Sequence, residues 1–238
     1  MKKLNLLPLL AFVALVVTLS SFTFARLVEE QSRNVGAFTK IGLSYPANVV
    51  LRQGNTHSVK VEGDADQLKD LVTEVKDGKL NIRTKERHWN MSWNNKERVN
   101  IYITMPRVEA IAVAGSGKIT SEDTFKADNL DLAVSGSGSI KLSARVNEVS
   151  SRIAGSGSIV LKGEGKESKV SISGSGALRG YAFETDQAQV SISGSGKCEI
   201  NAKSTLKSSI SGSGNVYYDG SPSVDSRVSG SGSVKRRS

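Results

Sequence analysis

Apolar residues recur in a fixed register around a repeated Gly-Ser-Gly motif in the second half of the chain. The seven motifs begin at Gly115, Gly136, Gly155, Gly174, Gly194, Gly212 and Gly230, in steps of 18–21 residues. Two positions before each motif stands a β-branched residue: Val113, Val134, Ile153, Ile172, Ile192, Ile210 or Val228. Four positions after each first glycine stands Ile119, Ile140, Ile159, Leu178, Cys198, Val216 or Val234. Apolar positions two or four residues apart share one face of a strand. The pattern predicts an all-β solenoid, a parallel β-helix with coils of 18–21 residues and two or three short strands per coil.

The alternation continues through the motif itself. It favours a bend within one strand, with both glycines facing inward and the serine facing outward. A turn between two strands is the alternative, and the alternation would then restart after the motif. In both cases the serines form an exposed ladder, which makes them candidate partner-binding residues: Ser116, Ser137, Ser156, Ser175, Ser195, Ser213 and Ser231. A second exposed ladder is expected one position before each motif, at Ala114, Ser135, Ala154, Ser173, Ser193, Ser211 and Ser229.

Residues 35–106 predict a β-rich part that leads into the repeat. Asp77-Gly78 separates two short strand patterns and predicts a tight hairpin. Residues 66–72 could form one or two helical turns, and Val99, Ile101 and Ile103 alternate as in a strand. No linker separates this part from the repeat region 107–238, so we expect one continuous domain over residues 35–238.

The N-terminus has the pattern of a secretory signal peptide. Lys2 and Lys3 precede an uncharged, largely apolar run from Leu4 to Ala25. We expect a signal peptide over residues 1–25 and a short lead over residues 26–34; an uncleaved anchor is the alternative, because the run is long enough to span a bilayer. The protein is therefore expected to be exported, to the periplasm, the outer-membrane surface or the medium.

Charge and cysteine content narrow the candidate chemistry. The formal net charge is +9, which favours anionic envelope components, although a solvated basic surface is the simpler interpretation. No motif for specific nucleic-acid recognition is present. Cys198 is the only cysteine, so no disulfide can form within the chain, and its place in the apolar column predicts a buried thiol.

The segment between Ile82 and Val99 interrupts two strand patterns and carries the remaining candidate partner-binding residues. It holds both tryptophans, Trp89 and Trp93, beside His88. Exposed aromatics among polar groups are typical of sugar or protein contacts, whereas tryptophans that fold back would cap the end of the solenoid. Acidic residues are scattered and only two histidines are present, so we expect no catalytic site, metal or cofactor. A polysaccharide-active β-helix enzyme and a purely structural envelope protein are the alternatives.

Three segments before the repeats carry a resemblance to a known family: Arg33–Phe38, Thr73–Leu80 and Val99–Pro106. With the export signal and the Gly-Ser-Gly repeats, they resemble the "putative autotransporter adhesin, head GIN domain" family. The resemblance implies a right-handed β-helix, a cell-envelope setting and no catalytic residues. We therefore expect a non-catalytic, adhesin-like protein that binds a cell-surface glycan, an anionic envelope component or a protein.

The last residues of the sequence indicate the oligomeric state that we expect. Val234 is followed only by Lys235, Arg236, Arg237 and Ser238, so no C-terminal transmembrane barrel is expected. The ends of a β-helix can pair with other chains unless they are capped. The terminal basic residues predict a blunted end and a monomer.

Overall fold

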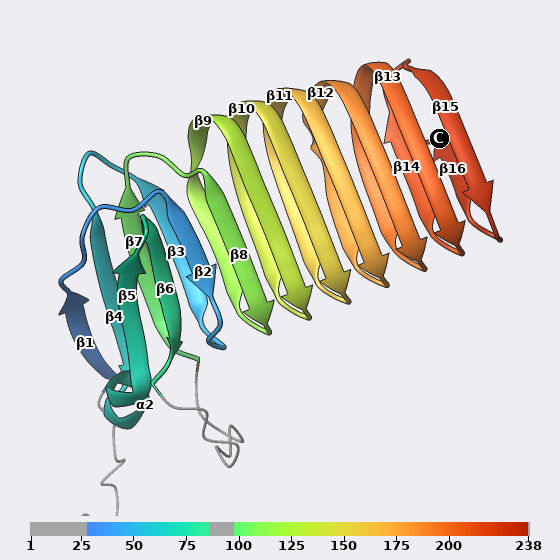
Figure 1. The fold of residues 1–238 in the computed structure, drawn as a ribbon. Coiled ribbons are helices and arrows are strands. Elements are labelled where there is room, and N and C mark those ends of the chain that lie inside the picture. Colours follow the sequence, from blue (N-terminus) through green and yellow to red (C-terminus); the bar gives the residue numbers. More distant parts are fainter. Residues whose placement is uncertain (1–27, 86–97, 238) are drawn as a thin grey trace, which may run out of the picture.

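The computed structural model describes residues 28–85 and 98–237, which form a β-solenoid of about seven turns (Figure 1). The elements in chain order are β1 (Val28–Arg33), β2 (Lys40–Leu43), β3 (Asn48–Gln53), β4 (Ser58–Asp64), α2 (Ala65–Asp70), β5 (Leu71–Lys76), β6 (Lys79–Thr84), β7 (Asn100–Met105), β8 (Ala110–Gly115), β9 (Lys118–Gly136), β10 (Ser139–Gly155), β11 (Ser158–Gly174), β12 (Ala177–Gly194), β13 (Lys197–Gly212), β14 (Asn215–Asp219), β15 (Ser223–Ser229) and β16 (Ser233–Arg236). In the part of the chain that is described, no helix has the length and apolar character needed to cross a membrane. The solenoid predicted from the repeat is confirmed.

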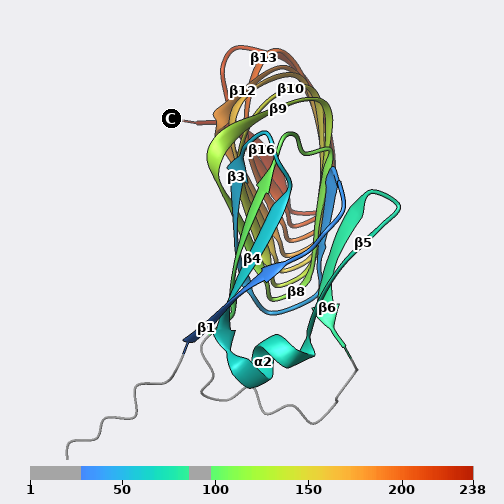
Figure 2. The same ribbon diagram turned by 90° about the vertical axis from the view of Figure 1, so that its left-hand side faces the viewer.

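Each central coil is one long strand that folds over at its top and is interrupted only at the Gly-Ser-Gly corner. The coil is flat, with two opposed sheet faces (Figure 2). We call the strand segments that run into the motif the entry face: residues 110–115, 129–136, 149–155, 168–174, 187–194, 205–211 and 223–229. The segments that leave the motif form the exit face: residues 118–120, 139–142, 158–161, 177–180, 197–200, 215–219 and 233–236. Neighbouring coils pair in parallel and in register, as Ile153 with Ile172 and Ile172 with Ile192.

The Gly-Ser-Gly motif separates two strands, so the expectation of one uninterrupted strand was wrong. The alternation expected from a bend is nevertheless kept, with the serine exposed and the second glycine buried. Strand β11 ends at Gly174 and β12 begins at Ala177, with the same break in the other coils. Gly174 has a φ of 110° and is half-buried, whereas Gly176 is buried. Only the second glycine faces the core. The first glycine makes the corner through its positive φ. The alternation of buried and exposed residues continues across the motif, with Ile172, Gly176 and Leu178 all buried.

The core is a narrow stack of aliphatic side chains, and Cys198 is buried in it as predicted. One column at the top of the coils is different. Register places Phe125 beside Ala144, Ala144 beside Gly163, and Gly163 beside Phe183. Both phenylalanines are fully buried. Only small residues, Ala144 and Gly163, stand between the two rings in this column.

The N-terminal part supplies the first strands of both faces. Strands β1, β4, β7 and β3 lead in order to β9 on the exit face, while β5, β6, β2 and β8 precede it on the entry face. The hairpin predicted at Asp77-Gly78 is confirmed: both residues have positive φ, and β5 pairs with β6 in antiparallel fashion. Asp64 caps the short helix α2 by accepting a hydrogen bond from the amide of Asp66.

Candidate binding surface

Nine exposed serines form a regular grid on three neighbouring coils. In β11, β12 and β13 a serine occurs three positions before, one position before and one position after the first glycine of the motif. The serine grid comprises Ser171, Ser173, Ser175, Ser191, Ser193, Ser195, Ser209, Ser211 and Ser213, all of them exposed. Strand spacing separates its rows by about 4.8 Å, and alternate residues along one strand lie about 6.6 Å apart. Six of these serines lie on the flat entry face, and Ser175, Ser195 and Ser213 continue the rows at the corner. The grid is a surface of small hydroxyl-bearing side chains.

Backbone pairing fixes the grid in place. Ser171 stands beside Ser191, and Ser191 beside Ser209, in the parallel ladder. At the corner the amide of Ser195 donates to the carbonyl of Gly174, with nitrogen and oxygen 2.9 Å apart. None of the nine hydroxyl groups forms a hydrogen bond with another residue in ranges 28–85 and 98–237. The hydroxyls are therefore free to bond to water or to a ligand.

The corner serines predicted from the sequence form one exposed line along the whole repeat. All seven are exposed, and so are the residues of the second ladder, Ala114, Ser135, Ala154, Ser173, Ser193, Ser211 and Ser229. The other predicted partner-binding residues, His88, Trp89 and Trp93, lie outside the described residues. The sequence analysis missed the column at Ser171, Ser191 and Ser209, although the same alternation, read two residues further upstream, places it on the exposed face.

A shallow hollow of about 210 Å³ adjoins the grid. It shares Ser171 and Ser191 with the grid, and Arg152, Lys169 and Gln189 add longer polar side chains. Lys169 lies 2.9 Å from Glu148 and 3.4 Å from Glu167. Its hydrogen bond to Glu148 raises the pKa of the ammonium group above its usual value, so Lys169 stays charged. Arg152 lies 3.2 Å from Asp131, so both cations of the hollow are paired with carboxylates, and Gln189 adds an amide beside the hydroxyl grid.

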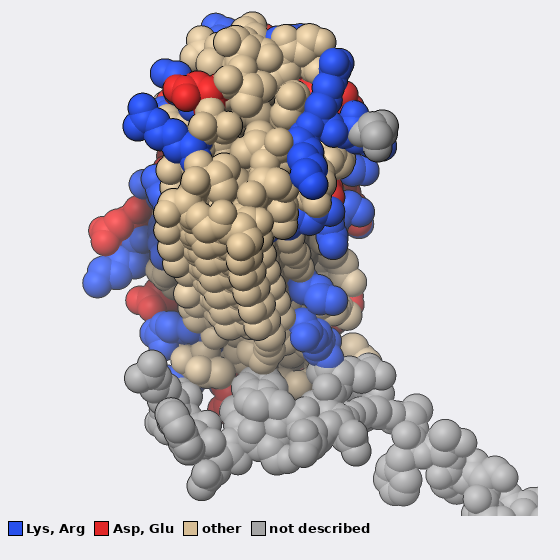
Figure 3. Space-filling view, turned by 90° about the vertical axis from the view of Figure 1, so that its right-hand side faces the viewer, with Lys and Arg blue, Asp and Glu red and all other residues tan. Residues whose placement is uncertain are grey.

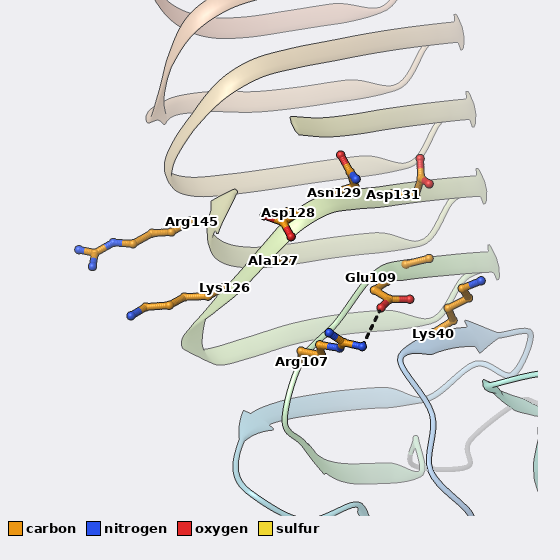
Figure 4. A pocket seen from close by; sticks show the side chains of 10 residues that line it. Lys40, Arg107, Glu109, Lys126, Ala127, Asp128, Asn129, Asp131 and Arg145 are labelled. Carbon is orange, nitrogen blue, oxygen red and sulfur yellow. Dashed lines mark ion pairs between the residues drawn. The ribbon is translucent and has the colours of Figure 1, made fainter. Parts of the chain in front are cut away.

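A larger hollow of about 690 Å³ lies on the same face near β8 and the upper turns of β9 and β10. In Figure 4 Arg107 and Glu109 face each other, at 3.6 Å, while Lys126 and Arg145 extend away from them. Its lining has no serine, threonine, tyrosine, cysteine or histidine. Its charged groups are lysines, arginines and carboxylates, so the hollow can accept a polar or charged group.

The exit face has larger and more charged side chains. One column of outward-facing residues stacks from coil to coil on this face. It contains Thr120, Lys141, Val160, Arg179, Glu199, Tyr217 and Lys235. The comparable column on the entry face contains alanines and serines. Lys197 reaches 5.0 Å from the ring centre of Tyr217 and pairs with Glu199 at 2.7 Å. The two faces therefore differ, and only the entry face is flat and rich in small hydroxyls.

Cys198 and His57 have structural roles in this fold. Burial raises the pKa of the Cys198 thiol above its usual range, which keeps it protonated. His57 lies with Nε2 3.0 Å from the carbonyl oxygen of Phe38, against the edge of that ring. Over residues 28–85 and 98–237, no three His, Cys, Asp or Glu side chains gather as metal ligands would.

Comparison with solved structures shows the same fold. An adhesin structure described as "putative" from Bacteroides fragilis NCTC 9343 matches with a TM-score of 0.82 and 21% identity, covering 90% of this chain and 98% of that one. A second adhesin described in the same way, from Parabacteroides distasonis ATCC 8503, matches at 0.73 and 23% identity, covering 90% and 98%. A "putative lipid binding protein" from the same Parabacteroides strain matches at 0.71 and 21% identity, covering 89% and 97%.

A search of curated proteins finds no match. The family model described as "Putative auto-transporter adhesin, head GIN domain" matches residues 37–222, which include β2 to β14 and six of the seven motifs. The resemblance stated from the sequence is confirmed, and the chain belongs to this family.

Proposed function

We propose that this protein is a non-catalytic, exported cell-envelope or secreted module that binds a surface polysaccharide through the serine grid. The observation that carries the proposal is the grid itself: nine exposed hydroxyls at strand spacing, none bonded within the described part of the chain. A repeating array of donors and acceptors matches a ligand that repeats along its own length. Arg152, Lys169 and Gln189 extend the surface with donors suited to acidic or hydroxylated sugars.

Family membership supports binding as the kind of function, because the family is described as adhesin-like. The net charge of +9 favours an acidic polysaccharide over a neutral one. The rigid backbone ladder adds to affinity, since little conformational freedom is lost when a ligand binds a preformed surface.

Removing two stacked hydroxyls from the grid should weaken binding. We expect Ser171→Ala with Ser191→Ala to reduce affinity about tenfold, because each hydrogen bond contributes about 0.5–1.5 kcal/mol. The measurement is retention of the purified protein on an immobilised panel of acidic and neutral polysaccharides. Both side chains are exposed, so folding should not change.

A matched control comes from the exit face. Ser139 and Ser158 stack on adjacent coils in the same way, at the strand starts of β10 and β11. Ser139→Ala with Ser158→Ala should leave retention unchanged. Failure of the wild-type protein to bind any polysaccharide, or an equal loss for both pairs, would contradict the proposal.

A further inference from the structure

The C-terminal end of the solenoid is open. Strand β15 pairs only with β13, and β16 only with β14, so the outer edges of both strands have no partner strand in the described chain. Val224 and Val228 stand in register with the buried residues Leu206 and Ile210, yet they are 39% and 43% exposed. The basic residues at the end of the chain do not cover them. Figure 3, which looks at this end, shows a largely uncharged centre with Lys and Arg around it.

The opposite end of the solenoid is protected. Its edge strand β1 turns Glu29, Gln31 and Arg33 to the side on which β4 buries Val59 and Val61. Charged side chains that point toward the core discourage an edge strand from pairing with another chain. The two ends therefore differ, and the C-terminal end is the one with apolar residues exposed along a free strand edge.

Two copies of β15 have complementary side chains when they are placed antiparallel to each other. The strand reads Ser-Val-Asp-Ser-Arg-Val-Ser from Ser223 to Ser229, with Ser226 at its centre. In an antiparallel pair centred on Ser226, each Asp225 faces the Arg227 of the other strand. Each Val224 then faces the other Val228, on the core side. Opposite charges and apolar pairs directly across an antiparallel ladder stabilise it.

We infer that the C-terminal end binds a second copy of this chain, through antiparallel pairing of β15 with its twofold mate centred on Ser226. The pairing joins the two solenoids end to end, gives the free backbone groups of β15 partners and covers the valines of both copies. In the dimer both C-terminal strand edges are paired. The polar edge strand β1 at the other end prevents further copies from adding. The inferred dimer differs from the monomer expected from the sequence, and the experiments below decide between them.

The strength of this dimer is limited by β16 on the opposite face of the last coil. The same twofold axis brings the edges of β16 together, and Lys235 and Arg236 from the two copies then approach one another. Arg237 is partly neutralised by Asp219, 3.9 Å away. We therefore expect a reversible dimer that forms with rising concentration.

Charge reversal tests both the partner and the register. Asp225 and Arg227 are exposed, so single reversals should fold normally. Arg227→Asp places two carboxylates opposite each other at both symmetric positions, and Asp225→Arg places two cations there. We expect each variant alone to dimerise at least about tenfold more weakly than the wild type in sedimentation velocity. Mixing the two variants should restore dimers, because every facing pair is then opposite in charge.

Several results would overturn the inference. A wild type that stays monomeric at every concentration would do so, and so would a mixture of the two variants that remains monomeric. Assemblies that grow beyond the dimer would show that the other end also pairs. Equal dimerisation of the wild type and both reversal variants would place the interface elsewhere.

Disulfide trapping gives an independent measure of register. Antiparallel partners directly opposite each other have Cα atoms about 4.5–5.5 Å apart, which suits a disulfide. Ser226→Cys should therefore form a covalent dimer under mild oxidation. Ser191→Cys, in the middle of the entry face, should not. Cys198 is buried and will not interfere. Absence of a crosslink in Ser226→Cys, or equal crosslinking in both variants, would contradict the register.

Discussion

Replacing Gly174 or Gly176 with alanine will destabilise the protein by about 2–4 kcal/mol, whereas Ser175→Ala between them will change stability by less than about 0.5 kcal/mol. Gly174 has a φ of 110°, and a Cβ atom there would lie 2.8 Å from the carbonyl oxygen of Gly155 in the preceding coil. A Cβ atom on Gly176 would meet the side chain of Ile153 and lie 2.8 Å from the carbonyl oxygen of Gly157. Both contacts are too short, and the backbone partners are held in the sheet.

Urea unfolding followed by circular dichroism measures these three variants under one set of conditions. The serine variant is the control, because Ser175 occupies the same corner and is exposed. If all three variants unfolded at the same urea concentration, the glycines would not be required by the geometry of the corner.

Phe183→Ala will destabilise the protein by about 3–5 kcal/mol. The ring is fully buried at the top of its coil, in the column that it shares with Gly163. A Cβ atom on Gly165 would lie 2.8 Å from the tip of this ring, which shows how completely the ring fills the space. Alanine would leave a cavity that the fixed sheet on both sides cannot close.

The control for this variant is Tyr217→Ala, which removes an aromatic ring of similar size from the surface of the exit face. Tyr217 is half-buried and contacts Lys197, so its loss should cost about 1 kcal/mol or less. Differential scanning calorimetry compares the two directly. Equal decreases in the Tm of the two variants would contradict the claim that the buried ring of Phe183 stabilises the fold more than the surface ring of Tyr217.

The sequence was sufficient to predict the solenoid because each coil repeats the same local pattern. Val or Ile before the motif and an apolar residue after it establish which side chains face the core, and parallel stacking then follows from the period. The same columns placed Cys198 inside and the corner serines outside. These features depend on alternation within one coil, which a single sequence contains in full.

Features that depend on contacts between coils could not be derived in the same way. The two glycines of each motif look equivalent in the sequence, but only the first has a positive φ and only the second faces the core. One inward column is not purely apolar, since Ser151 and Ser208 are buried in it beside valines. Val224 and Val228 follow the same apolar columns in the sequence, yet they are exposed because they lie in the last coil of the described chain.

The most direct test of the account is lysine footprinting of the native protein, alone and with a bound polysaccharide. Lys169 and Lys207 lie on the entry face beside the serine grid, and Lys141 lies on the exit face. If the ligand binds the serine grid, it will slow acetylation of Lys169 and Lys207 and leave acetylation of Lys141 unchanged. Protection of Lys141, with Lys169 and Lys207 still reactive, would show that the ligand binds the opposite face.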